Sequence, residues 1–204
     1  MNRGQEVTRL CDAEFRAMNG FLRRLLQRRF ELPVFRWLGL KGQGLDILEV
    51  GCGCGYGAVL LWRLKPKSYV GIDVMPEMID LALKREDVPE ADFRLMDAAG
   101  MYQIPDAAKD VVVIFDVLHH IPRWREVLSE CARVLRPGGA LFLEEPSASA
   151  IRLWDFLFHW GHPNEAMFAW QELEARLQEV GFTVKHRCRL WPLRSYCAVR
   201  TPQP

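Results

Sequence analysis

A run of closely spaced glycines is the most chemically informative feature of this sequence. Four glycines alternate over positions 51–57, directly after an apolar stretch, residues 45–50, that is typical of a buried parallel strand. Residues 58–62 then begin a helical pattern. A strand, a glycine turn and a helix start bring backbone N–H groups close to a ligand, because glycine has no Cβ to block the approach. The spacing therefore predicts a ligand-binding turn, although a glycine turn that binds nothing has the same pattern.

Carboxylates close the ends of the predicted strands. Glu49, Asp73, Asp97 and Asp116 each end or follow an apolar run. The carboxyl ends of parallel strands meet at one edge of a doubly wound sheet, so these side chains are expected to converge on one crevice. Asp73 lies about 20 positions after the first glycine, where an acid can accept hydrogen bonds from both hydroxyls of a ribose. Two local alternatives stay open: Asp73 as a helix cap, and Asp97 in an Asx-type turn.

Three stretches resemble one known family. The order E-x-G-x-G-x-G over 49–55 resembles motif I of the class I S-adenosylmethionine-dependent methyltransferases, in the group of small-molecule enzymes called type 11 or UbiE-like. The stretches D-V-L-H-H-I at 116–121 and V-L-R-P-G-G-x-L-F-L at 134–143 resemble later motifs of that family. The resemblance covers residues 45–200 and is strongest over 45–146. It implies an α/β fold with a Rossmann-like doubly wound sheet of seven strands, mostly parallel with the last strand antiparallel.

The same resemblance implies S-adenosyl-L-methionine as the cofactor and suggests roles for individual residues. Glu49 would neutralise the ammonium group directly or through water, and Asp73 would bind the ribose. Asp97 would accept a hydrogen bond from the adenine amine, while the backbone N–H of Ala98 would reach a ring nitrogen. The expected cofactor-binding residues are Glu49, Gly51, Cys52, Gly53, Gly55, Asp73, Val74, Asp97, Ala98 and Asp116.

One histidine is a candidate general base. His120 lies four residues after Asp116, a spacing at which some small-molecule methyltransferases carry a histidine. An unperturbed imidazole has a pKa of about 6.5, which suits proton acceptance from a substrate near neutral pH. A base is needed only if the methyl acceptor must lose a proton. The alternative is that one of His119 and His120 packs in the interior while the other caps a helix or faces solvent.

The chain divides into two predicted parts. Residues 1–44 are expected to form an N-terminal helical cap, and residues 45–204 the S-adenosylmethionine-binding methyltransferase domain, with a substrate-covering insertion at 147–169. Within the cap, residues 8–30 follow the spacing of one amphipathic helix that ends before Pro33. Its expected apolar face contains Met18, Phe21, Leu22, Leu25 and Leu26, and its basic face Arg23, Arg24, Arg28 and Arg29. The basic face predicts either a solvated lid helix or a peripheral contact with a membrane or an anionic substrate.

Composition excludes several classes of protein. The 204 residues carry a net charge of +1, which implies no polyelectrolyte partner, and no N/D-P-P-Y/F tetrad of nucleic-acid methyltransferases follows the fourth strand. No apolar run is long enough for a membrane span, and the N-terminus lacks the apolar core of a secretory signal. Six scattered cysteines favour a reducing, cytoplasmic location. Cys52-x-Cys54 has no second cluster, so no metal site is expected. The sequence carries no signal for an oligomeric state.

The expected activity is methyl transfer from S-adenosylmethionine to a small, apolar or lipid-like acceptor by in-line displacement. Dense aromatic residues over 147–170 support an apolar acceptor site, although they would also fit a satellite core beneath a long connection. A nicotinamide-dependent oxidoreductase is an alternative, because Gly53-x-Gly55-x-x-Ala58 also fits a dinucleotide-binding pattern. A non-catalytic nucleoside-binding regulatory protein is another.

Overall fold

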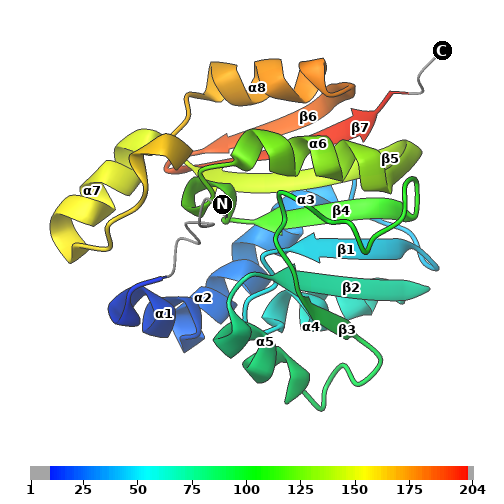
Figure 1. Ribbon diagram of the computed structural model, residues 1–204, viewed down its shortest axis with the longest axis horizontal. Coiled ribbons are helices and arrows are strands. Elements are labelled where there is room, and N and C mark those ends of the chain that lie inside the picture. Colours follow the sequence, from blue (N-terminus) through cyan, green and yellow to red (C-terminus); the bar gives the residue numbers. More distant parts are fainter. Residues whose placement is uncertain (1–9, 202–204) are drawn as a thin grey trace, which may run out of the picture.

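The computed structural model describes residues 10–201, which form a seven-stranded mixed sheet with helices on both faces (Figure 1). The strand order is β3-β2-β1-β4-β5-β7-β6. All neighbouring strands are parallel except those that pair with β7, which runs antiparallel to both β5 and β6. The predicted fold class is therefore confirmed. The strands are β1 Asp46–Val50, β2 Ser68–Asp73, β3 Asp92–Leu95, β4 Lys109–Phe115, β5 Leu135–Pro146, β6 Phe182–Leu190 and β7 Leu193–Arg200.

The helices pack in two layers, one on each face of the sheet. One apolar cluster joins α6 and α8 to the sheet, and a second joins α3, α4 and α5 to its other face. The α-helices are α1 Asp12–Met18, α2 Phe21–Leu26, α3 Leu32–Trp37, α4 Tyr56–Leu61, α5 Pro76–Leu83, α6 Trp124–Val134, α7 Ala148–Phe158 and α8 Trp170–Glu179. Short 3-10 helices are η2 Trp62–Leu64, η3 Leu118–His120 and η4 Asn164–Ala166, and η1 Gln27–Glu31 is a π-helix.

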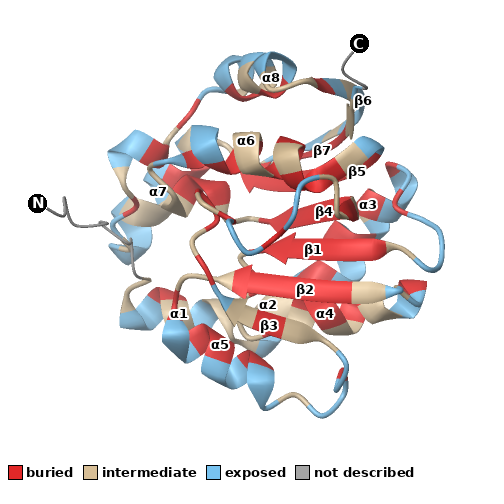
Figure 2. Ribbon diagram, turned by 45° about the vertical axis from the view of Figure 1, so that its right-hand side comes forward, coloured by how far each residue is buried: buried red, intermediate tan, exposed pale blue. Residues whose placement is uncertain are grey.

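The central strands are buried on both faces, which explains their continuous apolar sequences. Every residue of β1 is buried, and so are residues 111–115 of β4, because helices cover both sides of them (Figure 2). Figures 1 and 2 show α1, α2 and α7 at the end of the sheet toward which β1 and β4 point. This end of a doubly wound sheet is where ligands bind.

The N-terminal segment differs from the single amphipathic helix expected over residues 8–30. Residues 8 and 9 lie outside the described part of the chain, and a turn at Asn19 and Gly20 separates α1 from α2. That turn changes the helical phase, so Phe21 and Leu22 are 79% and 76% exposed instead of buried. The chain also stays helical through Pro33, which occupies the first turn of α3, where its missing N–H is tolerated.

Residues 32–40, the C-terminal part of the predicted cap, pack against the hydrophobic core of the sheet. The ring of Phe35 in α3 stacks on Phe115 at the end of β4, with ring centroids 5.0 Å apart. Leu32, Leu38 and Leu40 are buried in the same cluster. Residues 32–40 therefore pack on the sheet, whereas α1 and α2 lie beyond its end. The domain boundary at residue 44 stays a prediction. Within residues 10–201, no helix combines the length and apolar character that a membrane crossing requires.

Candidate active site

A cavity of about 440 Å³ opens at the carboxyl ends of β1, β2 and β4, within the size range of small-molecule sites. Its lining includes the candidate base His120 and nearly all the predicted cofactor-binding residues: Glu49, Gly51, Cys52, Gly53, Asp73, Val74, Asp97, Ala98 and Asp116. Gly55 is the exception: it begins α4 with φ +75°, and a Cβ there would approach Phe93 and Arg85. The convergence of the strand-end carboxylates that the sequence predicted is thus present in the structure.

Two glycines of the turn have no room for a side chain. Gly51 has φ +71°, and a Cβ on it would overlap Val117, which follows β4. A Cβ on Gly57 would overlap the carboxylate of Glu49. The thiol of Cys52 is buried, which raises its pKa and keeps it protonated. Close approach of chain segments therefore explains why positions 51 and 57 require glycine.

Gly51→Ala is expected to destabilise the fold by about 1–3 kcal/mol more than Gly44→Ala does, because the new methyl group overlaps Val117. Gly44 is the matched control: its φ is +69°, and a Cβ there meets nothing within 4 Å. Urea unfolding of the two variants measures the difference. Equal destabilisation would mean that only the backbone conformation, and not the packing, requires glycine at position 51.

Asp73 holds the glycine turn against the start of the next helix. Its Oδ2 accepts a hydrogen bond from Gly53 N at 2.9 Å, and its Oδ1 accepts one from Met75 N at 2.9 Å. Met75, not Asp73, is the N-cap residue of α5. Burial raises the pKa of Asp73, while the backbone donors act in the opposite direction. The carboxylate is thus fixed at the edge of the cavity, and its ribose-binding role stays a prediction.

Glu49 lies beneath the turn and is almost fully buried. The hydroxyl of Tyr69 donates a hydrogen bond to its Oε2 at 2.5 Å. Burial raises the pKa of Glu49 to about 8, although this hydrogen bond and the charge of Arg23 lower it. A cationic ligand group nearby would favour the ionised form instead, because opposite charges stabilise one another.

The free energy of unfolding is expected to fall as the pH rises from about 4.5 to about 8, because folded Glu49 keeps its proton over a range in which the unfolded chain has lost it. Burial raises the pKa of Glu31 and of Glu144 as well, and these two groups act in the same direction. Glu49→Gln should therefore show a smaller loss of stability over this range. Urea midpoints at several pH values measure it, and the same slope in both proteins would contradict the shifted pKa.

Asp97 forms an Asx-type turn, which the sequence pattern predicted as the alternative to adenine binding. Its Oδ1 accepts a hydrogen bond from Ala99 N at 2.8 Å. Its Oδ2 lies 3.4 Å from Nη2 of Arg123, which also donates to the Ala99 carbonyl oxygen at 3.1 Å. The turn presents Asp97 and Ala98 to the cavity, so it is compatible with adenine binding, which stays a prediction. Sequence reasoning missed Arg123, because nothing in its local pattern indicates a contact 26 residues away.

The N-terminal segment supplies a buried arginine at the other end of the cavity. Arg23 of α2 forms an ion pair with Glu31, and its Nη2 lies 3.8 Å from Oδ2 of Asp116. Asp116 has φ +63°, and its Oδ1 is buried without a hydrogen bond among the described residues. The sequence placed Arg23 on an outward basic face. The change of helical phase at Gly20 turns it inward instead.

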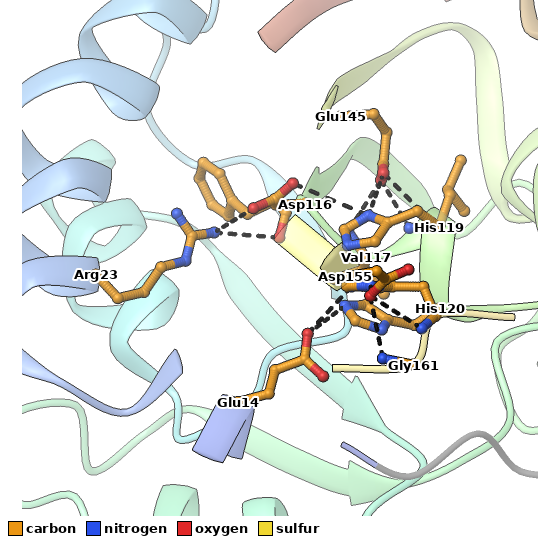
Figure 3. A network of polar contacts seen from close by, with 12 residues as sticks. Glu14, Arg23, Asp116, Val117, His119, His120, Glu145, Asp155 and Gly161 are labelled. Carbon is orange, nitrogen blue, oxygen red and sulfur yellow. Dashed lines mark hydrogen bonds and ion pairs between the residues drawn. The ribbon is translucent and has the colours of Figure 1, made fainter. Parts of the chain in front are cut away.

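His119 and His120 lie close to Asp116 (Figure 3), and the ring of His162 packs against both of them. His119 is buried, and its Nδ1 lies 2.8 Å from Oε2 of Glu145. Glu145 also accepts hydrogen bonds from the backbone N–H groups of Val117 and Leu118, at 2.9 and 2.7 Å, which fix the loop after β4. Of the adjacent pair His119 and His120, the first is therefore the packed residue.

His120 faces a carboxylate from the N-terminal segment. Its Nε2 lies 3.6 Å from Oε1 of Glu14 in α1. Nε2 of His162 lies 3.2 Å from the same oxygen, and Nδ1 of His162 lies 2.6 Å from Asp155. Burial lowers the pKa of His120 well below its ordinary value, with contributions from His119 and His162. The ring of His120 is therefore neutral near pH 7, and its lowered pKa makes it a weaker base than an unperturbed imidazole, so its catalytic role stays a prediction.

Glu14, Asp155 and His162 were not predicted as site residues. The sequence pattern favoured a structural or exposed role for both His159 and His162. His159 is exposed in the left-handed conformation that ends α7, whereas His162 is buried. No spacing rule relates Glu14 to residues more than 100 positions further on, so only the structure brings them together.

Comparison with known proteins gives a consistent result. Residues 48–143 match a family model described as a methyltransferase domain. A Mycolicibacterium smegmatis protein named as a probable S-adenosylmethionine-dependent methyltransferase is 38% identical over 120 residues, which are 59% of this chain and 45% of that protein. The phthiotriol/phenolphthiotriol dimycocerosates methyltransferase of Mycobacterium tuberculosis is 43% identical over 97 residues, 47% of this chain and 36% of that protein. A fatty-acid O-methyltransferase of M. smegmatis is 39% identical over 98 residues, 48% of this chain and 35% of that protein.

The chain spans less than half the length of these curated relatives. Solved structures extend the similarity to most of the chain. An S-adenosylmethionine-dependent methyltransferase from Aquifex aeolicus superposes with a TM-score of 0.75 at 19% identity, covering 94% of this chain and 99% of that one. One from Methanosarcina mazei gives 0.67 at 23% identity, covering 84% and 98%. Because these sequence identities are only 19% and 23%, the structural similarity shows a shared fold and is not evidence for a shared substrate.

Proposed function

We propose that this chain, which belongs to the class I S-adenosylmethionine-dependent methyltransferases, transfers the methyl group of S-adenosyl-L-methionine to a small, apolar or lipid-like acceptor. One observation carries the proposal: Glu49, Asp73, Asp97 and Asp116, from four separate strand ends, line a single cavity with the glycine turn. That cavity continues between the N-terminal segment and the loop after β4. The first part suits the methyl donor and the second an acceptor.

The residues present fit the methyl donor. Residues 51–62, which comprise the glycine turn and helix α4, contain no lysine or arginine, as expected for a ligand without phosphate groups. Glu49 can neutralise an ammonium group, and Asp73 can accept from ribose hydroxyls with the lone pairs that its two backbone donors leave free. Asp97 and Ala98 offer an acceptor and a donor to adenine. The bound donor supplies a methyl group on a positively charged sulfur, so the protein contributes mainly alignment and exclusion of water.

The acceptor is proposed to be apolar because of the side chains around its end of the cavity. Leu10 and Met18 enter from the N-terminal segment, and Ile121 from the loop after β4. The predicted covering segment 147–169 forms α7 and η4 at the same end of the sheet (Figure 1), although none of its residues lines the cavity, so its role in enclosing the acceptor stays a prediction. The named activities of two relatives, on phthiotriol lipids and on fatty acids, support the same class of acceptor.

An assay of methyl transfer tests the proposal directly. The purified full chain is incubated with S-adenosylmethionine that carries an isotopically labelled methyl group and with long-chain alcohols, phenols, amines and acids. Labelled product with at least one acceptor class is expected. Calorimetry distinguishes the alternatives: saturable NAD binding without S-adenosylmethionine binding would indicate an oxidoreductase. Donor binding without methyl transfer to any of these classes would instead indicate a regulatory protein.

A peripheral membrane contact would give the site access to lipid acceptors from the cytoplasmic side. Phe21 and Leu22 of α2 are strongly exposed, and Arg28 and Arg29 are exposed beside them. Exposed apolar side chains next to basic ones are typical of helices that lie in an anionic lipid interface. Phe156 and Leu157 of α7 are exposed at the same end of the molecule.

Phe21→Ser/Leu22→Ser is expected to weaken binding to phosphatidylglycerol vesicles about tenfold, because two apolar side chains no longer enter the interface. Co-sedimentation with vesicles at low and high salt measures the loss. The matched control is Leu81→Ser/Leu83→Ser, which changes two exposed leucines of α5 and should bind like the unchanged protein. Equal binding of all three proteins would remove α2 from the membrane contact.

A further inference from the structure

A buried group of charged and polar side chains joins three distant chain segments beyond the cofactor acids. Glu14 comes from α1, His120 from η3, and His162 from the loop after α7 (Figure 3). The side chain of Glu14 is only 3% exposed, and its Oε1 lies 3.2 Å from Nε2 of His162 and 3.6 Å from Nε2 of His120 without a well-oriented hydrogen bond to either ring. Burying a carboxylate oxygen without a well-oriented hydrogen-bond donor lowers the stability of the fold, so this arrangement calls for a functional explanation.

The two neighbouring histidines already have partners that fix their rings. Nδ1 of His119 is paired with Glu145, and Nδ1 of His162 with Asp155. Pairing with Glu14 and Asp155 raises the pKa of His162 against the effect of burial, whereas burial lowers that of His120, so His162 carries a proton more readily than His120 does. His120 differs from both, because it lines the cavity and its carboxylate, Glu14, lies just beyond hydrogen-bond distance.

We propose that Glu14 is the positioning residue for His120 as general base, and that the acceptor atom they serve is the oxygen of a neutral hydroxyl group, not a carboxylate. This proposal rests on the proposed methyltransferase function. Glu14 would hold the tautomer of His120 with its proton on Nε2, which leaves the lone pair of Nδ1 for the acceptor. A small approach, from 3.6 Å to hydrogen-bond distance, completes the pair when an imidazolium forms.

The step balances without any further reactant. The hydroxyl oxygen forms a bond to the methyl carbon while the carbon–sulfur bond breaks, and the electron pair of that bond stays on sulfur. The hydroxyl proton moves to Nδ1 of His120. The imidazolium that results is stabilised by the charge of Glu14. The products are a methyl ether, a neutral thioether and a protonated histidine, which returns its proton to solvent after product release.

The charges at the acceptor end disfavour an acceptor that is already anionic. Arg23 is the cation nearest to Asp116, and it is occupied by Asp116 and Glu31. Among residues 10–201, the buried Oδ1 of Asp116 accepts no hydrogen bond and lies 4.0 Å from Nδ1 of His119, so it can accept from a hydroxyl but would repel a carboxylate. A carboxylate also needs no base, which would leave the Glu14–His120 arrangement without a use.

Matched acceptors test the choice of atom. The full chain is assayed with a long-chain alcohol, an alkylphenol, a fatty acid and an alkylamine of similar chain length. Methyl ether formation at least tenfold faster than ester or N-methyl formation is expected. Preferred methylation of the acid or the amine would overturn the hydroxyl assignment while leaving the methyltransferase function intact. No product from any acceptor would contradict the function itself.

A double-mutant cycle tests the role of Glu14. Glu14→Gln is expected to lower kcat roughly tenfold or more and to move the acidic limb of the pH–kcat profile to lower pH, because His120 loses its stabilising charge. His119 and His162 with their carboxylates, and Asp116, also face this ring and are unchanged. In a His120→Asn background the same substitution should have no effect on kcat. Additive losses would show that Glu14 acts independently of His120 and would overturn the proposal.

Controls separate this result from damage to the fold. Glu90→Gln changes an exposed glutamate and should leave all parameters unchanged, and Glu14→Asp should recover part of the lost kcat. Affinity for S-adenosylmethionine should be the same in all of these variants. The three imidazoles could also hold a cation, since ligand atoms of the group lie within 4.8 Å of one another. Loss of turnover with EDTA and its return with zinc would therefore overturn the general-base assignment.

Discussion

Asp73→Ala is expected to weaken the binding of S-adenosylmethionine more than tenfold. The substitution removes a charged acceptor for the ribose, and hydrogen bonds to charged groups contribute about 1.5–3 kcal/mol each. It also releases the backbone N–H groups of Gly53 and Met75, which are held at 2.9 Å, so the turn loses part of its preorganisation. Isothermal titration calorimetry measures the dissociation constant, and circular dichroism shows whether the fold is retained.

Two matched variants show which property of Asp73 matters. Asp80→Ala removes an exposed acid from the adjoining helix α5 and should leave the affinity unchanged. Asp73→Asn keeps an acceptor oxygen for one backbone N–H but loses the charge, so its affinity should lie between those of the alanine variant and the unchanged protein. An Asp73→Ala protein with unaltered affinity would remove this residue from the cofactor site.

His120→Asn is expected to lower turnover of a hydroxyl acceptor by about 10²–10⁴-fold while affinity for S-adenosylmethionine is retained. The reason is that asparagine keeps polarity and approximate size but cannot accept a proton near neutral pH. Single-turnover kinetics with saturating donor separate this loss from any effect on binding.

The control for that experiment is His186→Asn, which changes an exposed histidine of β6 far along the chain from the site. It should show normal kinetics. If His120→Asn retains normal turnover across the pH range, the histidine is not the base, and the acceptor reacts without losing a proton to this ring.

The part of the cavity proposed to bind the cofactor was predictable from sequence because its determinants are local. An apolar strand, a glycine turn and an acid about 20 residues later fix the positions of Glu49, Gly51 and Asp73 through backbone geometry alone. The rule that ligands bind at the carboxyl ends of parallel strands then brings Asp97 and Asp116 to the same edge. Each of these residues lies on or directly after a strand whose neighbours are set by topology.

The acceptor half was not predictable, because its contacts are long-range and depend on helical phase. The sequence pattern placed Arg23 on the basic face of one predicted helix and Phe21 on its apolar face. The turn at Gly20 exchanges these environments, and helical spacing cannot reveal an interruption of this kind. Glu14 meets His162 only because α1 and the loop after α7 lie at the same end of the sheet.

The two halves of the site thus come from different stretches of the polypeptide. The segment that matches the family model, residues 48–143, carries the glycine turn and the strand-end acids, whereas Glu14, Arg23 and His162 come from the flanking sequences. If the proposed roles hold, evolution can change the preferred acceptor by substituting or exchanging the flanking segments, while the residues proposed to bind the methyl donor stay the same. A chimera that grafts the flanks of a relative onto this central segment should acquire the relative's preference and keep the original affinity for the methyl donor.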